Sequence, residues 1–189
     1  MRIVLASASP RRAELLTSAG FEFERRPADV DETRHAGETP EVYALRVARL
    51  KARAIGTASE IHASPIVAAD TVVIADGRIL GKPRDREDAR DMLKSLSGRI
   101  HEVLTAVVVR VGEREFSDVV TTRVRVLLLT DAEIASYIAS GEPEGKAGAY
   151  AIQGRAARYI DWIEGSWSNV VGLPIATVHR LLTAAGEAD

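Results

Sequence analysis

The sequence predicts an α/β fold with a mixed sheet and flanking helices. Apolar segments typical of strands and amphipathic segments typical of helices mix irregularly along the chain. Residues 101–129 alternate over two long stretches joined near Gly112, which is typical of an antiparallel hairpin. No repeat, low-complexity tract or linker interrupts the chain, so we expect one domain over residues 1–189.

Capping residues and turns mark the elements of the first 80 residues. "RIVLAS" is typical of a short buried strand, and Ser9 before a proline indicates a helix over 10–18. "FEFERR" alternates like an edge strand and leads into a polar loop. Thr39 caps a second helix over 40–55. "SPIVAADTVVIADGRIL" then predicts a longer strand, a turn at 76–77 and a short return strand.

Capping signals also place the helices of the second half. Asp85 caps a short helix, and Thr130 with Glu133 forms a capping box that opens another. The stretch 141–154 is rich in glycine and aperiodic, which predicts a loop. A late strand is expected in "ARYIDWIEGS", followed by a C-terminal helix that begins at Pro174.

Charge and composition exclude several classes of function. Lys and Arg number 25 against 27 Asp and Glu, and 3 Phe, 4 Tyr and 2 Trp give only nine aromatic residues, which disfavours a nucleic-acid binder. Cysteine is absent, which excludes disulfides, thiolate nucleophiles and cysteine-based zinc sites. The N-terminus lacks the apolar core of a signal peptide, and no apolar run approaches a membrane span. We therefore expect a cytoplasmic protein that binds neither nucleic acid nor membranes.

Two arginines at the start of the first helix indicate an anion. Arg11 and Arg12 lie where the positive end of the helix macrodipole disfavours cations, unless an anion joins them. Backbone N–H groups at the helix start would add to such a site. Taken alone, two arginines in a first helical turn are more often solvated than part of a phosphate site.

A carboxylate in an apolar strand is the second indication. Asp70 lies within "IVAADTVVIA", where an unpaired charge is costly, so a cation, a metal or a hydrogen-bond network is expected beside it. Further polar residues lie just past predicted strands or on loops and helices where a site could form. They are Ser7, Arg11, Arg12, Asp31, Glu32, Lys51, Thr71, Lys82, Lys146 and Gln153.

This set supplies what a polyphosphate with a divalent metal requires. Arginine binds phosphate through a bidentate fork and lysine as a point charge. Magnesium is usually held by one or two carboxylates plus phosphate oxygens, and Asp70 and Glu32 could serve as those ligands. The chain has no P-loop, no G-x-G-x-x-G motif and no nucleophile elbow. The residues alone predict a site for a phosphate-rich anion with a metal, and they leave open whether the anion is hydrolysed.

Seven motifs together resemble those of the Maf family of nucleotide pyrophosphatases, in the same order and spacing, from about residue 3 to about residue 182. They are "LASASPRRAELL", "DVDE", "AADTVV", "GKP", "SGRIHEVLTAV", "GEPEGKAGAYAIQG" and "SNVVGLP". Departures are small: Trp167 stands where the family often has Tyr, and Ala106 where Gly is common.

The resemblance implies a fold and a reaction. The fold would be related to that of the inosine triphosphate pyrophosphatases (the Maf/Ham1 fold), with an elongated mixed sheet and two lobes around a cleft. The reaction would hydrolyse the α–β phosphoanhydride of a nucleoside triphosphate, with Mg²⁺ or Mn²⁺, and release a monophosphate and pyrophosphate. "KAGAYAIQG" and the Thr after the implied catalytic Asp resemble the dTTP/UTP pyrophosphatase branch.

The same resemblance implies roles for single residues. Asp70 would be the catalytic proton acceptor and would share the metal with Glu32. The positions that match substrate selection are Arg11, Thr71 and Gln153. The positions that match substrate binding are Ser7, Arg12, Lys51 and Lys82.

Two alternatives stay open. Within the family, the nearest is a 7-methyl-GTP pyrophosphatase, against which the amide of Gln153 argues. The other is a nucleotide-binding regulator without turnover, because the family is linked to nucleotide house-cleaning and to control of septum formation. An intact Asp70 favours an enzyme, since a passive binder needs no base. Modified pyrimidine triphosphates as substrates and a homodimer are expectations from the resemblance alone.

Overall fold

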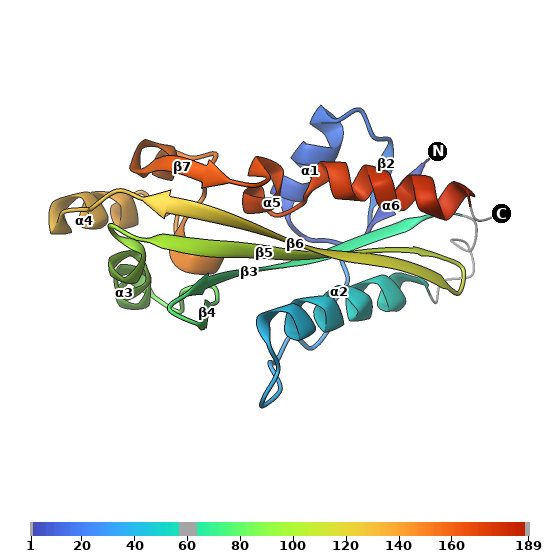
Figure 1. Cartoon of the computed structure of the whole chain (residues 1–189), viewed down its shortest axis with the longest axis horizontal. Coiled ribbons are helices and arrows are strands. Elements are labelled where there is room, and N and C mark those ends of the chain that lie inside the picture. Colours follow the sequence, from blue (N-terminus) through green and yellow to red (C-terminus); the bar gives the residue numbers. More distant parts are fainter. Residues whose placement is uncertain (1, 57–63, 188–189) are drawn as a thin grey trace. The chain divides into compact units, whose positions relative to one another are not determined.

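The computed structural model describes residues 2–56 and 64–187 (Figure 1). Its strands are β1 (Ile3–Leu5), β2 (Phe23–Arg25), β3 (Ile66–Ala75), β4 (Arg78–Leu80), β5 (Ile100–Val111), β6 (Arg114–Val126) and β7 (Ile160–Glu164). Its helices are α1 (Pro10–Ser18), α2 (Pro40–Gly56), α3 (Arg86–Leu96), α4 (Asp131–Ala139), α5 (Trp167–Val171) and α6 (Ile175–Glu187), with short 3₁₀ turns η1 (Ala147–Ala149) and η2 (Arg155–Tyr159).

The pairing of the strands confirms the mixed sheet. The described residues form seven strands in the order β2-β1-β3-β5-β6-β7, with β4 paired to β3. Strand β1 is parallel to both β2 and β3, whereas β4 and β7 pair with their neighbours in the antiparallel sense. Parallel neighbours require crossover connections, which α1 and α2 supply. The edge position predicted for "FEFERR" is confirmed by β2.

Some local details differ from the sequence-based expectation. Residues 155–159 form η2, so the late strand begins only at Ile160. Helix α5 was not expected, because five residues are too few to show a helical period. Ser9 occupies the N-cap position of α1, but its hydroxyl makes no capping hydrogen bond; its N–H instead donates to Ser7 Oγ at 3.2 Å.

The described residues group into two compact units. Unit 1 contains those within Met1–Thr71, Thr105–Val120 and Gly172–Asp189, and unit 2 contains Val72–Leu104 and Thr121–Val171. Strands β3, β5 and β6 each contribute one part to unit 1 and the other part to unit 2. The cleft implied by the family resemblance stays a prediction.

In unit 1 the strands carry helices on both faces, with α1 and α6 on one face and α2 on the other (Figure 1). Side chains alternate along a strand, so odd-numbered and even-numbered residues of β3 face opposite helices. The core on the α1 and α6 face contains Ile3, Leu5, Leu16, Val67, Ala69, Val107, Leu173, Val178 and Leu181. Even-numbered residues of β3 therefore face α2.

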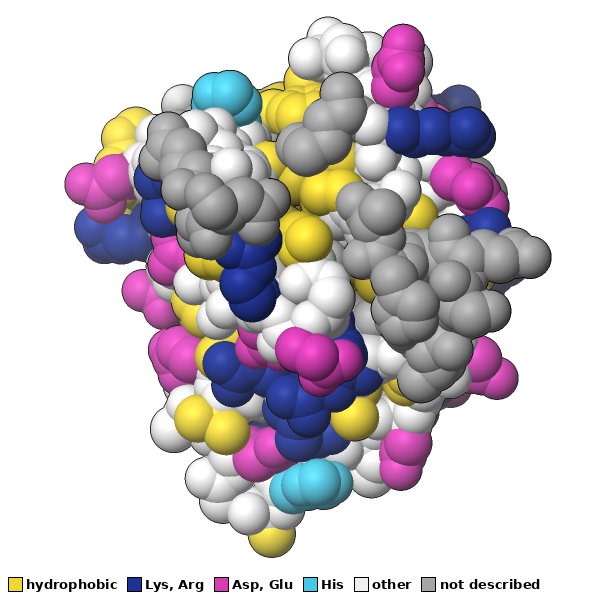
Figure 2. Space-filling view, turned by 90° about the vertical axis from the view of Figure 1, so that its right-hand side faces the viewer, with side chains coloured by type: hydrophobic (Ala, Val, Ile, Leu, Met, Phe, Trp, Pro, Cys, Tyr) yellow, Lys and Arg dark blue, Asp and Glu magenta, His cyan; other side chains and the backbone are white. Residues whose placement is uncertain are grey.

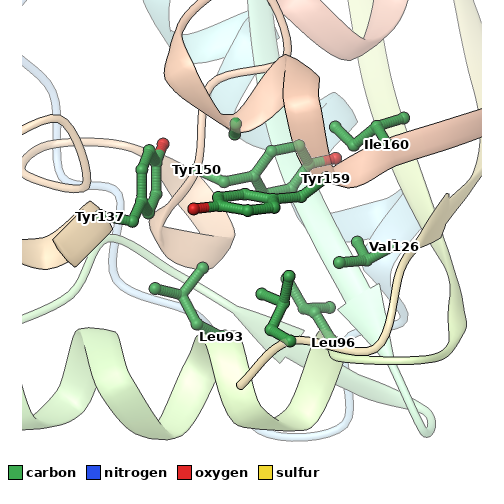
Figure 3. A pocket seen from close by; sticks show the side chains of 9 residues that line it. Leu93, Leu96, Val126, Tyr137, Tyr150, Tyr159 and Ile160 are labelled. Atoms are coloured by element: carbon green, nitrogen blue, oxygen red, sulfur yellow. The ribbon is translucent and has the colours of Figure 1, made fainter. Parts of the chain in front are cut away.

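Three tyrosines close the apolar core of unit 2. The rings of Tyr137, Tyr150 and Tyr159 lie over Leu93 and Leu96 (Figure 3), and the first and last of these rings meet edge-on with their centroids 6.2 Å apart. They leave an apolar cavity of about 20 Å³. Ligand pockets are typically of about 300–1,000 Å³, so this cavity is a packing gap and no nucleotide site.

The surface carries both signs of charge. On the face that Figure 2 presents, basic side chains lie among acidic ones. Ion pairs also join the two signs elsewhere in the described residues: Arg49 pairs with Glu115 at 2.5 Å, and Arg53 lies 3.8 Å from the same carboxylate. This mixture agrees with the net charge of -2. None of the helices over residues 2–56 and 64–187 combines the length and the apolar character that a bilayer span needs.

A buried histidine makes unit 2 sensitive to acid. His101 is 2% exposed, its Nε2 lies 2.7 Å from Tyr150 Oη, and burial lowers the pKa of His101 from 6.5 to about 4. The unfolded chain therefore binds this proton more readily, so the stabilisation is present above pH 6.5 and is lost as the pH falls towards 4.

We expect His101 to lower the free energy of unfolding by about 2 kcal/mol between pH 7 and pH 5. Urea denaturation of the wild type and of His101→Phe at both pH values measures this effect. In His101→Phe the free energy of unfolding should decrease less between pH 7 and pH 5 than in the wild type. An equal decrease in both proteins would contradict the expectation.

Candidate active site

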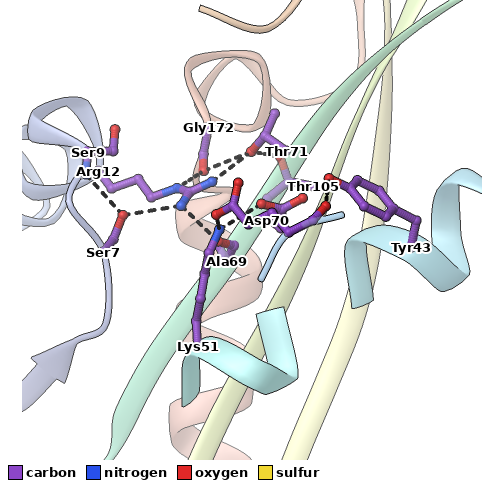
Figure 4. A network of polar contacts seen from close by, with 11 residues as sticks. Ser7, Ser9, Arg12, Tyr43, Lys51, Ala69, Asp70, Thr71, Thr105 and Gly172 are labelled. Carbon is purple, nitrogen blue, oxygen red and sulfur yellow. Dashed lines mark hydrogen bonds and ion pairs between the residues drawn. The ribbon is translucent and has the colours of Figure 1, made fainter. Parts of the chain in front are cut away.

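The carboxylate of Asp70 lies in β3 with its Oδ1 2.8 Å from the ammonium of Lys51 (Figure 4). Both residues are 8% exposed. Asp70 is an even-numbered residue of β3 and faces α2, which carries Lys51, whereas Thr71 faces the opposite side. The partner expected for a charge in an apolar strand is therefore present, and it is a cation.

A second carboxylate contacts the same ammonium. Glu32 Oε1 lies 2.6 Å from Lys51 Nζ, so two acidic groups converge on one cation. Glu32 belongs to the loop between β2 and α2, and its side chain is more exposed than that of Asp70. An oxygen from the loop and an oxygen from the strand thus meet at one point.

The loop that carries Glu32 is fastened to α2. Tyr43 Oη donates to the carbonyl of Glu32 at 2.9 Å, and Arg46 donates to the carbonyl of Thr33 at 2.9 Å. Arg46 also binds Glu38 at 2.5 Å, and this hydrogen bond lowers the pKa of Glu38 to about 2. Burial raises the pKa of Tyr43, so its hydroxyl keeps the proton that it donates. These contacts hold Glu32 beside the helix that carries the lysine.

Arg12 is buried and donates four hydrogen bonds to protein atoms. Nε donates to the carbonyl of Gly172 at 2.8 Å, and Nη2 donates to Thr71 Oγ1 at 3.1 Å. Nη1 donates to Ser7 Oγ at 3.2 Å and to the carbonyl of Ala69 at 2.7 Å. Burial lowers the pKa of Arg12, yet a guanidinium stays charged at any ordinary pH. Arg12 therefore ties α1 to the β3 residues on both sides of the buried carboxylate (Figure 4).

Gly172 closes this network from the C-terminal part of unit 1. Its φ of +127° belongs to a region that favours glycine, and its carbonyl accepts from Arg12 and, at 3.3 Å, from Thr71 Oγ1. Thr71 Oγ1 also lies 2.9 Å from Thr105 Oγ1. Sequence reasoning did not assign Gly172 or Thr105. The glycine of "VVGLP" and the single threonine within "VLTAVVV" are the signals that could have found them.

The loop between β1 and α1 is held from two sides. Ser7 Oγ accepts from the N–H of Ser9 and from Arg12. Arg25 of β2, which sequence reasoning also missed, donates to the carbonyl of Ser7 at 3.2 Å and to the carbonyl of Ala8. The start of α1, where an anion was predicted, is thus a fixed part of unit 1.

Asp70 and Glu32 fit a divalent cation. Their oxygens already converge on one positive charge, and carboxylate oxygens are ligands that Mg²⁺ and Mn²⁺ prefer. In the part of the chain that the structure describes, no group of three or more His, Cys, Asp or Glu could hold a metal. Two carboxylates are the usual protein share of a magnesium site that also uses phosphate oxygens and water.

The structure brings some of the predicted residues together and leaves others elsewhere. Those gathered in unit 1 are Ser7, Arg12, Glu32, Lys51, Asp70 and Thr71. Arg11 is half-buried in the first turn of α1, and the side chain of Asp31 accepts from the N–H of Thr33.

Unit 2 carries the remaining predicted residues. Lys82 and Gln153 have exposed side chains. Lys146 donates to the carbonyl of Glu144 at 2.9 Å. Roles of these three residues in a nucleotide site stay predictions.

A comparison with known protein families matches residues 2–185 to the family described as Maf-like protein. The chain belongs to the Maf family. This match confirms the resemblance that the seven sequence motifs indicated. It covers residues of both units of the fold.

Curated relatives of this Maf-family protein carry one name. A protein of Syntrophotalea carbinolica is 52% identical over 97% of this chain and 84% of its own length, and one of an Anaeromyxobacter species is 53% identical over 98% and 90%. A protein of Shewanella denitrificans is 45% identical over 100% and 98%. Each is called "dTTP/UTP pyrophosphatase".

Among solved structures, "The structure of the Staphylococcus aureus Ham1 protein" matches 67% of this chain and 72% of its own, with a TM-score of 0.45 and 17% identity.

Proposed function

We propose that this Maf-family protein is a nucleoside triphosphate pyrophosphatase that hydrolyses dTTP and UTP, and modified pyrimidine triphosphates of the same shape, to a monophosphate and pyrophosphate. One observation carries the proposal: the buried carboxylate of Asp70 is joined through Lys51 to Glu32, within the motif order of the family. Relatives that are 45% to 53% identical and bear the name dTTP/UTP pyrophosphatase support the choice of substrate.

Asp70 is the proposed base. A water oxygen forms a bond to the α-phosphorus, and the bond from that phosphorus to the bridging oxygen breaks. The electron pair leaves with pyrophosphate, while the proton of the water goes to Asp70. Asp70 and Glu32 would hold Mg²⁺ or Mn²⁺, which when bound neutralises phosphate charge and favours deprotonation of water. Reactions of this type depend mainly on positioning and on charge stabilisation.

The cations of the site would bind the triphosphate. Lys51 supplies a point charge beside the two carboxylates. The family motif "GKP" is the basis for proposing Lys82 as a further cation for the phosphates. Arg12 has four of its five N–H donors on protein atoms, so its main proposed effect is to fix the site and to add one positive charge. Ser7 is proposed to contribute through the loop that its hydroxyl organises.

Gln153 is proposed to recognise the base, together with Arg11 and Thr71. A side-chain amide can donate and accept at once, so Gln153 can meet both a carbonyl oxygen and the N3–H of uracil or thymine. Cytosine has no N3–H and carries an exocyclic amine, so it would need the amide turned by 180°. An amide held in the orientation that meets uracil therefore favours uracil and thymine over cytosine.

The test is pyrophosphate release from dTTP, UTP, CTP, 7-methyl-GTP and ATP with Mg²⁺ or Mn²⁺. We expect kcat/KM for dTTP and UTP to exceed that for CTP and ATP by at least about tenfold, and turnover to stop when the metal is chelated. A preference for 7-methyl-GTP would assign the chain to the other branch of the family. Nucleotide binding without any turnover would instead favour a regulator.

A further inference from the structure

We propose that Tyr137 and Glu142 are positioning residues that hold segment 151–156 so that Gln153 is presented to the base. The inference rests on the proposed function, because it concerns how the chain distinguishes its substrates. All the residues involved belong to unit 2. The two residues act on the backbone before and after the amide, and neither needs to touch the nucleotide.

Glu142 holds the backbone that follows Gln153. Its Oε2 accepts from the N–H of Arg155 at 2.9 Å, and its Oε1 accepts from the N–H of Ala156 at 3.4 Å. Hydrogen bonds to an ionised carboxylate are stronger than those between neutral groups. The carboxylate therefore fixes the chain two and three residues beyond the amide.

Gly154 makes this approach sterically feasible. A Cβ at that position would lie 2.5 Å from both carboxylate oxygens of Glu142, which is closer than side chains tolerate. A glycine directly after Gln153 is thus required for the carboxylate to reach the backbone. The motif "IQG" thus contains both Gln153, which would contact the base, and Gly154, which leaves room for the carboxylate of Glu142.

Tyr137 holds the backbone that precedes Gln153. Its hydroxyl accepts from the N–H of Ala151 at 3.2 Å and donates to Glu142 Oε1 at 2.8 Å. Burial and the hydrogen bond to Glu142 raise the pKa of Tyr137, so the hydroxyl keeps its proton and both bonds persist at neutral pH. The edge-on contact with Tyr159 fixes the ring (Figure 3).

In the segment between these two anchors, buried residues precede an exposed glutamine. Ala151 and Ile152 are 7% and 5% exposed, whereas the side chain of Gln153 is exposed. The amide thus projects from a backbone that is anchored on both sides. A group ordered in advance loses less entropy when it binds, and an anchored backbone limits how far the amide can adapt to a second base, so anchoring Gln153 strengthens discrimination between bases.

Glu142→Gln tests the inference directly. The new glutamine side chain has the size of the glutamate. Its NH₂ group must, however, face one of the groups that donate hydrogen bonds to Glu142 in the wild type. We expect the ratio of kcat/KM for UTP over CTP to fall about tenfold, through a higher KM for UTP, with kcat changed less than about threefold. The matched control is Glu144→Gln, an exposed carboxylate in the same loop, which should keep the ratio of the wild type.

Tyr137→Phe tests the other anchor, and hydrogen exchange reads out the anchoring without turnover. The variant should lower the same ratio and speed exchange of the amide of Ala151, and Glu142→Gln should speed exchange at Arg155 and Ala156. Tyr159→Phe removes a hydroxyl from the neighbouring ring and serves as its control. Unchanged exchange over 151–156 in both test variants would overturn the inference.

A double-mutant cycle with Gln153→Ala tests whether Glu142→Gln changes the UTP over CTP ratio by way of the Gln153 side chain. If it does, Glu142→Gln lowers the UTP over CTP ratio in the wild type but adds nothing in the Gln153→Ala background. An undiminished effect in that background, or a ratio like that of Glu144→Gln, overturns the inference and leaves the proposed function standing. Failure of the proposed function shows itself separately, as absence of dTTP and UTP turnover in the wild type.

Discussion

Replacement of Asp70 by Asn should lower kcat for dTTP and UTP by about 10³-fold with the fold intact. Asparagine has the size of aspartate and keeps an oxygen that can accept from Lys51. It cannot take a proton from water, and it removes one of the two carboxylate charges that would hold a metal. Steady-state pyrophosphate release measures the loss, and a thermal unfolding curve beside it shows that the fold persists.

Asp76→Asn is the control for this substitution. Asp76 follows the same strand in the turn before β4, where it is exposed and pairs with Arg99 at 2.6 Å. An exposed ion pair contributes little, so this variant should keep the turnover of the wild type. An Asp70→Asn enzyme that retains more than about a tenth of the activity would remove Asp70 from the role of base.

Arg12→Ala should lower the free energy of unfolding by about 3 kcal/mol or more. The guanidinium donates to the buried carbonyls of Ala69 and Gly172, which would lose their donors when the side chain is removed. Each such loss costs about 1–3 kcal/mol. Arg12→Lys should recover only part of this stability, because one ammonium cannot reproduce the directions of a guanidinium fork. Urea denaturation followed by circular dichroism gives the values.

Arg180→Ala is the control for Arg12→Ala. It removes an arginine that takes no part in the buried hydrogen bonds of Arg12. Arg180 lies on α6 of the same unit, is exposed, and pairs with Asp118. Exposed pairs of this kind contribute about 1 kcal/mol or less. If Arg12→Ala destabilises the protein no more than Arg180→Ala does, the hydrogen bonds of Arg12 do not support the fold as described.

Local signals predicted the elements and the most important side chain. A serine followed by a proline predicted the start of α1, and the capping box at Thr130 and Glu133 is present at the start of α4. Asp70 was expected to have a partner because a charge among apolar neighbours on a strand cannot stay unpaired. Each of these inferences depends on residues within a few positions of one another, where the sequence determines the geometry.

Contacts between distant residues were beyond such reasoning. The partner of Asp70 lies 19 residues earlier, and the carbonyl that Arg12 Nε binds lies 160 residues later. The macrodipole argument predicted an anion for Arg12, whereas the structure gives it carbonyl and hydroxyl acceptors of its own chain. An arginine just after a strand can either bind backbone carbonyls or bind phosphate. The sequence around it is the same in both cases, so the sequence alone does not distinguish them. The role of Arg12 towards phosphate stays a prediction.

The alternation of β3 also limits how this part of the chain can vary. Asp70 and Thr71 are consecutive, yet one faces Lys51 on α2 and the other faces Arg12 on α1. Deleting or inserting one residue before them would exchange the two faces, bringing a hydroxyl to the lysine and a carboxylate to the arginine. Viable variants of β3 should therefore differ by substitution and keep its length, whereas the loop between β2 and α2 can change length wherever Glu32 still reaches the lysine.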